Sequence, residues 1–335
     1  MDIVTQGLAG AVVARAAVAR APARTVLALG AFAGLLADAD VLIRSADDPL
    51  LTLDFHRHFT HALLFVPIGA AIAAIVAWPF VRRRLGFQTI YTITFFGYLP
   101  SGLLDACTSF GTHLLWPFSE VRTAWSVIAV VDPAFSLVLA AGIALTLARG
   151  GAWPSRVALA LALAYLGTGW LQHERARVVA ARVAADRGHD VTRLEVKPTL
   201  GNLVLWRSIY ESDHRFHVDA VRVGIVAPTR VYPGESVERF SLRAVPTLDP
   251  TSRLWRDIER FMRFSDDFVA VHPHQPAVLG DVRYALLPTS AIPLWGIELD
   301  LAAPGRHAAF RTFRDTDATL RWQFLTMLRG APVEH

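Results

Sequence analysis

Five apolar runs constrain the fold of this chain more than any other feature. A helix needs about 20 residues to cross the hydrocarbon core of a bilayer. Five stretches reach or approach that length: 25–43, 61–81, 88–107, 125–148 and 155–171. Only 19% of the residues are charged, whereas an average soluble domain carries about 25%. The sequence therefore predicts a multi-span α-helical membrane domain, with one further short helix in the small-residue-rich stretch 3–19.

Arginines are concentrated on one set of connections between these runs. This set consists of the segments before the first run, between the second and third, and between the fourth and fifth. Its arginines are Arg15, Arg20, Arg24, Arg82, Arg83, Arg84, Arg149 and Arg156. The opposite connections hold Arg44, Arg57 and Arg122. The positive-inside rule places the arginine-rich set in the cytoplasm, so the other ends of the runs share the outer side. The acidic start, Met1-Asp2, is unlike a cleavable signal peptide.

The sequence from residue 172 onward differs in composition and hydrophobic pattern. A charged, alanine-rich stretch at 172–187 is typical of a helix. Short β-type runs separated by turn residues follow at 192–197, 203–210, 215–226, 268–271, 281–287 and 295–301. We therefore expect an α+β chain, with a membrane domain at 1–175 and a soluble, mainly antiparallel β domain at 176–335. The same topology places this second domain outside the cytoplasm.

Polar side chains gather at the outer ends of the apolar runs. They are Asp38 and Asp40 after the first run, His56, His58 and His61 before the second, and Asp105, Thr108, Thr112 and His113 after the third. Ionisable residues near lipid are costly and usually functional. Because the topology brings these ends to one side of the membrane, we expect the three groups to meet.

Aspartate and histidine without cysteine favour a hydrolytic metal centre. A metal in such a centre lowers the pKa of bound water and polarises a phosphoryl or acyl oxygen. A structural zinc site is usually rich in cysteine, and Cys107 is the only cysteine here. The scattered arginines do not form the basic face of a nucleic-acid-binding protein.

Each candidate residue also has a purely structural interpretation. Asp38 and Asp40 could end a solvated helix, and the histidines could contact lipid headgroups. Asp105 could cap a helix or pair with Arg122. Asp132 precedes Pro133 inside the fourth run, where it could face the site or accept hydrogen bonds from freed backbone donors.

Four segments resemble a known bacterial family. They are DIVTQG at 2–7, GLLADAD at 34–40, HRHFTH at 56–61, and LD at 104–105 followed by Thr108, Gly111 and Thr112. Together they are similar to the YdjM/YbcI-like inner-membrane family (domain of unknown function 457), regarded as metal-dependent hydrolases. The resemblance covers about residues 1–132, and two tail motifs, LWR at 205–207 and DVRY at 281–284, resemble the extension of some members. By position it implies metal ligation by Asp38, Asp40, His56, His61 and Asp105. Ala37 stands where the family usually has Pro, and His58 where it usually has Gly.

The sequence as a whole predicts a multi-pass inner-membrane hydrolase that uses a divalent metal, with zinc as the expected ion. His58 or Asp132 would complete the metal shell or act as general base, and Arg57 would stabilise phosphoryl charge. The expected partners are the bilayer and a phosphoester or lipid-linked substrate. One alternative is a non-catalytic membrane protein with a structural metal or ion-pair hub and a partner-binding β domain. A transporter is less favoured because the ionisable residues crowd one end of the spans.

Overall fold

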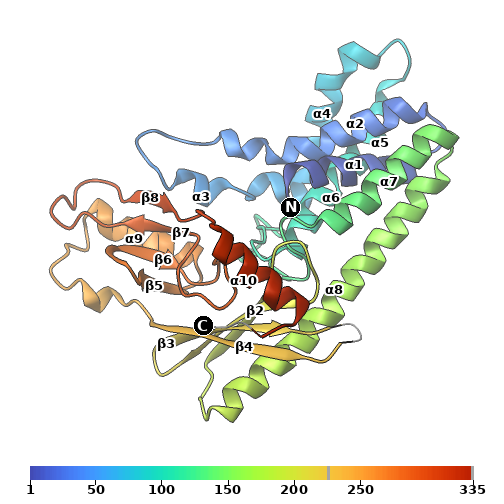
Figure 1. The fold of residues 1–335 in the computed structure, drawn as a ribbon. Helices are drawn as coiled ribbons and strands as arrows, with labels where there is room; N and C mark the ends of the chain where they lie inside the picture. Colours follow the sequence, from blue (N-terminus) through green and yellow to red (C-terminus); the bar gives the residue numbers. More distant parts are fainter. Residues whose placement is uncertain (225–226, 333–335) are drawn as a thin grey trace. The chain divides into compact units, whose positions relative to one another are not determined.

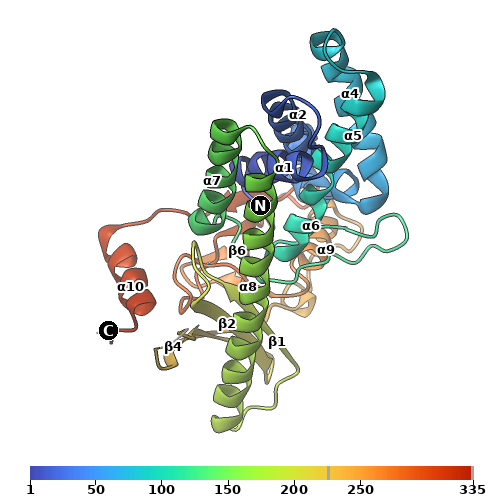
Figure 2. The same cartoon turned by 90° about the vertical axis from the view of Figure 1, so that its right-hand side faces the viewer.

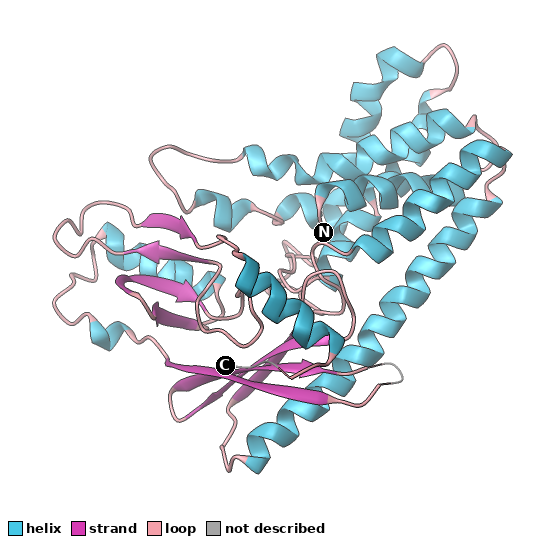
Figure 3. Cartoon of the chain, in the orientation of Figure 1, coloured by secondary structure: helices cyan, strands magenta, loops and turns pink. Residues whose placement is uncertain are grey.

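The computed structural model describes residues 1–224 and 227–332, and the chain has an α+β fold (Figure 1). Two compact units are present. The helical unit contains Met1–Ile43, Phe55–Leu171 and Leu200–Asn202. The β unit contains Arg44–Asp54, Gln172–Thr199 and the described residues from Leu203 onward. Figure 3 shows that the strands all belong to the second unit, whereas the first is built from helices and loops.

Small residues allow the helices of the helical unit to pack closely. The unit contains α1 (Ile3–Ala17), α2 (Ala23–Leu36), η1 (Ala37–Leu42), η2 (Phe59–His61), η3 (Leu63–Phe65), α4 (Val66–Val81), α5 (Phe87–Tyr98), α6 (Pro100–Cys107), α7 (Pro133–Arg149) and the first half of α8 (Trp153–Asp186). At Gly10 a Cβ atom would lie 2.4 Å from the Gly30 carbonyl oxygen and 2.7 Å from that of Gly97. Contact of α1 with α2 and α5 therefore requires glycine at this position.

Two helical segments among the described residues are long and apolar enough to cross a membrane. They are Ala23–Leu42, which joins α2 to η1, and Leu63–Val81, which joins η3 to α4. Helices α1 and α7 are apolar but shorter. The expected third span is divided, because α5 ends at Tyr98 and α6 begins at Pro100. In the expected fourth span the helix begins only at Pro133, and the expected fifth is the start of α8, which continues to Asp186.

The β unit contains two antiparallel four-stranded sheets, which confirms the predicted strand arrangement. The first has the order β1 (Arg193–Pro198), β2 (Leu205–Ser212), β3 (Arg215–Arg222) and β4 (Arg230–Glu238). The second has the order β5 (Val269–His272), β6 (Gln275–Asp281), β7 (Trp295–Glu298) and β8 (Ala309–Thr312). The remaining elements are α3 (Leu51–Phe55), at the boundary with the helical unit, η4 (Leu242–Ala244), α9 (Arg253–Phe264) and α10 (Ala318–Arg329).

The observed strands differ from the expected runs in several places, since the run 281–287 shares only Asp281 with a strand, and β4, the rest of β6 and β8 lie outside every expected run. Residues 282–287 form turns after β6 rather than a strand. Strand β4 lacks an alternating apolar pattern because most of its side chains are exposed, and the sequence did not reveal it. The end of the expected run 215–226 lies outside the described residues.

The core of the first sheet lies beneath the second half of α8. Ala176 and Ala180 pack against Trp206 and Val221, so the helix lies along the sheet (Figures 1 and 2). The two tail motifs also meet inside this unit, because an Nη atom of Arg207 donates a 2.8 Å hydrogen bond to the Val282 carbonyl oxygen. This contact gives both motifs a structural role in the β unit.

Candidate metal centre

Short non-α segments place the polar residues of the helical unit. Helix α2 gives way to the 3-10 helix η1, which carries Asp38 and Asp40. His61 ends the 3-10 helix η2, and Asp105 lies on α6. At Gly102 on α6 a Cβ atom would lie 2.0 Å from the His61 carbonyl oxygen. Glycine at this position therefore lets α6 contact the histidine segment directly.

Asp38, His61 and Asp105 form a compact three-residue group. Each offers one ligand atom, and these atoms all lie within 4.8 Å of one another. The Nε2 atom of His61 lies 3.0 Å from an Asp105 oxygen and 3.4 Å from an Asp38 oxygen. The side chains of His61 and Asp105 are fully buried, and that of Asp38 is 12% exposed. Three chain segments that are far apart in sequence therefore meet at one point.

The ligand atoms of His61 and Asp105 make close ionic contacts, because Asp105 Oδ2 lies 3.0 Å from His61 Nε2 and 3.1 Å from Arg57 Nε. Asp38 Oδ2, the oxygen that does not face His61, is buried and has no hydrogen-bond partner within the described part of the chain. Buried polar atoms are almost always satisfied, and each exception requires an explanation. Two carboxylates and one imidazole are suitable ligands for zinc. The donor set and the unsatisfied Asp38 oxygen therefore fit a divalent cation.

Asp40 lies behind His61 rather than in the three-residue group. One of its oxygens accepts hydrogen bonds from the Arg57 backbone N–H (2.6 Å) and the Thr60 hydroxyl (3.1 Å). The same oxygen lies 3.4 Å from His61 Nδ1. The Thr60 hydroxyl, which donates to Asp40, also lies 3.0 Å from His61 Nδ1, so Asp40 holds the second ring nitrogen of His61 largely through Thr60. Such outer partners fix the tautomer and orientation of a metal-bound histidine. This position suits a residue that orients His61.

His56 contacts Asp40 rather than the three-residue group. Its Nδ1 atom is 3.2 Å from the other Asp40 oxygen, and its side chain is 29% exposed. The His56 ring also contacts Phe110, with the ring centroids 5.5 Å apart. Of the five residues predicted as ligands, the structure thus brings Asp38, His61 and Asp105 into one group and places Asp40 and His56 beside it.

Arg57 joins the segments around the group. Its backbone has a positive φ of 58°, and its Nε atom lies 3.1 Å from Asp105 Oδ2. Its Nη atoms donate to the Thr108 hydroxyl (3.2 Å) and the Met1 carbonyl oxygen (3.1 Å). The Met1 amino group forms an ion pair with Asp105. No motif pointed to Met1, because a backbone amine belongs to no sequence motif.

Comparison with known families shows the family of the chain. The family model of the YdjM inner membrane protein matches residues 1–176, more than half of the 335-residue chain. The chain belongs to the YdjM family. No curated protein and no solved structure matches it. The match covers the YdjM motif segments and every predicted site residue, and it supports location in the inner membrane.

Charge balance around His61 in this YdjM protein includes a cationic imidazole. Burial lowers the pKa of His61, but its contacts with Asp105, Asp38 and Asp40 outweigh burial and raise the pKa to about 10. In the absence of metal the imidazole is therefore protonated at pH 7 and offsets part of the carboxylate charge. A metal would replace this proton, because a histidine ligand must be neutral.

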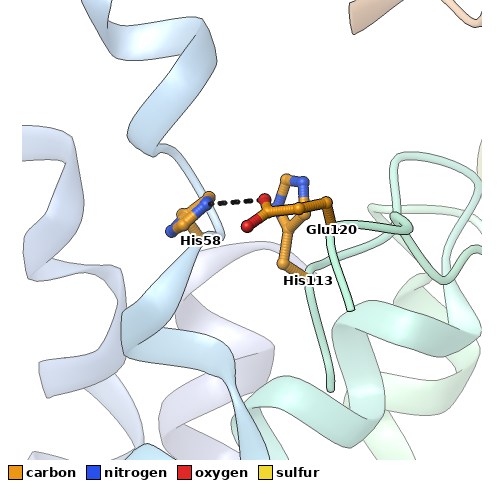
Figure 4. A group of neighbouring side chains, drawn as sticks. All are labelled: His58, His113 and Glu120. Carbon is orange, nitrogen blue, oxygen red and sulfur yellow. Dashed lines mark ion pairs between the residues drawn. The ribbon is translucent and has the colours of Figure 1, made fainter. Parts of the chain in front are cut away.

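His58 belongs to a different group in the YdjM structure. Its Nε2 atom is 3.9 Å from a Glu120 oxygen, and its ring centroid is 4.5 Å from that of His113. Figure 4 shows His58 facing the Glu120 carboxylate, with the His113 ring beside it. Burial, together with the charge of Arg122, lowers the pKa of His113 to about 4. His58 and His61 thus take part in separate groups although only three positions separate them.

Asp132 caps a helix. It precedes α7, accepts a 3.1 Å hydrogen bond from the Phe135 backbone N–H and accepts another of 2.9 Å from the Tyr165 hydroxyl. Pro133 occupies the first helical position, where its missing N–H has no cost. Both contacts match the structural interpretation of Asp132, with Phe135 on α7 and Tyr165 on α8.

Proposed function

We propose that this YdjM family member is a membrane-embedded, metal-dependent hydrolase. The observation that carries the proposal is the group of Asp38, His61 and Asp105, which brings one ligand atom from each of two carboxylates and one imidazole within 4.8 Å of one another. Structural zinc sites are closed and usually rich in cysteine, whereas catalytic ones have three protein ligands and an open position. Two carboxylates and one histidine match the second description.

Asp38, His61 and Asp105 would hold the ion, with zinc the best match to these donors. When bound, a divalent metal supplies an activated water and polarises a phosphoryl or acyl oxygen. Asp40 would hold the His61 ring in the ligating orientation. The Arg57 guanidinium, 3.1 Å from Asp105, would stabilise negative charge that develops on the substrate. Because the contacts of His58 and Asp132 lie elsewhere, the proposal assigns them no step.

The position of the group along the chain favours a site at one membrane surface. Asp38 and Asp40 lie at the end of the segment Ala23–Leu42, and His61 lies two residues before the segment Leu63–Val81. If both segments cross the bilayer, these residues share one side. Arginine asymmetry then makes this the outer face, in a multi-pass protein whose β unit is periplasmic.

A lipid-linked phosphoester is the substrate class that this position favours. An apolar groove runs along α1, lined by Ile3, Val4, Gly7, Leu8, Ala11, Ala31, Leu35 and Ile143. The same helix begins directly after Met1 and Asp2, and Met1 contacts Asp105. An acyl chain in this groove would bring its headgroup toward the metal group.

The alternative is a non-catalytic ion-pair hub with a partner-binding β unit. Its supporting observation is the charge balance: the Met1 amino group, Arg57 and a protonated His61 all contact Asp105. Such a cluster can be stable without a metal. The two proposals therefore differ in whether the purified protein retains an ion and whether that ion supports hydrolysis.

Metal content of detergent-purified protein tests the proposal. After brief exposure to a weak chelator, the wild type should retain about one metal ion per chain, whereas His61→Ala and Asp105→Ala should retain almost none. His272→Ala, a buried histidine of the β unit, serves as the control and should match the wild type. Near-zero metal in all four proteins would overturn the proposal. Metal retained without hydrolysis of a chromogenic phosphodiester or of a phospholipid in mixed micelles would favour the hub.

Reporter fusions test the topology separately. A fusion after Arg84 should report the cytoplasm, and one after Pro332 should report the periplasm. The same compartment for both would contradict the proposed orientation.

A further inference from the structure

We propose that His58, His113 and Glu120 form a second metal site, separate from the group around His61. The site would take a borderline transition-metal ion such as Zn²⁺, Cu²⁺ or Ni²⁺. This inference does not depend on the proposed function, because it rests on different residues and contacts.

Backbone hydrogen bonds hold the two histidine segments together. The Arg57 carbonyl oxygen accepts hydrogen bonds from the His113 backbone N–H (3.2 Å) and the Thr112 hydroxyl (2.8 Å). The Leu63 N–H donates to the Leu114 carbonyl oxygen at 3.0 Å. The loop after Thr112 is thus fixed on both sides of His58. These contacts hold the backbone positions of His58 and His113 close together.

The three side chains offer a plausible ligand arrangement. One ligand atom from each lies within 4.8 Å of the other two, and the carboxylate faces His58 (Figure 4). Ligand atoms about 2.0–2.2 Å from a tetrahedral zinc ion lie roughly 3.4 Å apart. The Glu120 side chain is 78% exposed and can therefore move the remaining distance at little cost. A contraction of at most about 1.4 Å between any two ligand atoms, from 4.8 Å to roughly 3.4 Å, would complete the site.

The chemistry of the donors favours a metal over a simple ion pair. A distance of 3.9 Å between His58 and Glu120 is too long for a hydrogen bond. The His113 Nδ1 atom is buried and has no hydrogen-bond partner among the described residues. Two imidazoles and one carboxylate are also the ligand set of several open zinc sites. Imidazole equally suits copper and nickel.

Aromatic side chains surround His58 and restrict its ring. Trp116, Phe55 and Phe59 have ring centroids 5.6, 6.0 and 6.3 Å from that of His58. These rings contact the imidazole, while the Glu120 side chain is largely exposed. A bound ion would therefore be accessible to solvent and exchangeable, whereas the group around His61 is almost completely buried.

Copper titration of the detergent-purified protein distinguishes the two groups. In an Asp105→Ala background, Cu²⁺ should bind at one equivalent per chain, and its electron paramagnetic resonance spectrum should show two coordinated nitrogens. Adding His58→Ala or His113→Ala should lower the affinity at least tenfold and remove the two-nitrogen signal. Adding Glu120→Gln should weaken binding while the two nitrogens remain.

Matched controls separate metal loss from misfolding. His214→Ala removes an exposed histidine of the β unit and should leave the Cu²⁺ signal unchanged, and each variant should keep the wild-type circular dichroism spectrum. The proposal is overturned if folded His58→Ala and His113→Ala variants bind Cu²⁺ as tightly as their parent. It is also overturned if the parent shows only weak binding through one nitrogen, because that would indicate adventitious surface binding.

Discussion

Both units of this protein bury charged side chains, but they satisfy them differently. In the β unit, Arg283 donates to both oxygens of Asp281 (3.0 and 2.9 Å) and to the Phe264 carbonyl oxygen (2.8 Å), and it pairs with Asp266. In the helical unit, His61 and Asp105 lie 3.0 Å apart, and Asp105 also lies 3.1 Å from Arg57 Nε. The first arrangement is complete in hydrogen bonds within the chain, whereas the second is held by close ionic contacts.

The difference separates a structural ion pair from a binding group. A buried charge is tolerated only when its partners offset the loss of hydration. Arg283 and Asp281 meet that requirement with groups that the fold always supplies. Around His61 the buried carboxylate charge is offset in part by a proton on the imidazole, and a metal ion would offset it more fully. Similar burial is thus satisfied by fixed groups of the chain in one unit and by a proton or, under the proposed function, a metal ion in the other.

The largest expected effect is in the β unit. Asp281→Ala leaves the buried Arg283 guanidinium without its bidentate partner, so we expect a loss of about 3–5 kcal/mol in unfolding free energy. Because no metal is involved there, the loss measured by denaturant unfolding should be the same with and without chelator. Asp315→Ala, an exposed carboxylate, should change the free energy by less than about 0.5 kcal/mol. A metal-dependent loss in Asp281→Ala would remove the contrast between the units.

The next effect concerns metal-linked stability of the helical unit. In a His113→Ala background, zinc at 100 times its dissociation constant should raise the unfolding free energy by about 2.7 kcal/mol. Asp105→Asn keeps the side-chain shape but removes a ligand charge, so this increment should disappear. Thermal unfolding with zinc and with chelator measures it. An unchanged increment in Asp105→Asn would exclude this carboxylate as a ligand.

A smaller effect should separate Asp40 from the ligands. Asp40→Asn weakens the group that orients His61, and loss of such a partner lowers metal affinity about 10–100-fold. The number of ions bound at saturating zinc should stay the same, which competition with a chromogenic chelator can determine. If Asp40→Asn instead abolishes binding at saturation, Asp40 is itself a ligand.

The smallest expected effect is at Asp132. Asp132→Ala removes the cap of α7, which costs about 1 kcal/mol, and should leave metal content unchanged. Unfolding measurements and metal analysis of the same preparation test both statements. Metal loss in folded Asp132→Ala would return this residue to the candidate site.

Much of the candidate site could be predicted from the sequence, because the order of the apolar runs places its residues at neighbouring ends. Asp38, His61 and Asp105 lie at ends of apolar runs that alternate in direction, and the structure brings them together. The separation of His58 from His61 was not predictable, because helical spacing places both on one face. The positive φ at Arg57 and the short 3-10 helix after it direct the two rings apart.

The fold was predictable to a similar degree. The α+β class and the antiparallel strands follow from composition and turn residues. The division of the third apolar run at Pro100 and the late start of α7 at Pro133 depend on how backbone donors are satisfied. Apolar content alone does not determine that. Strand β4 remained hidden because its exposed side chains have no hydrophobic period.

Arg57 contacts residues of both candidate sites and would therefore couple metal binding at one site to metal binding at the other. Its backbone N–H is bound to Asp40, its carbonyl oxygen to Thr112 and His113, and its side chain lies against Asp105. A ligand that rotates this peptide at one site must alter the other. By reciprocity, an ion in either site would then change the affinity of its neighbour by the same factor, which makes Arg57 the residue through which cooperativity would be transmitted.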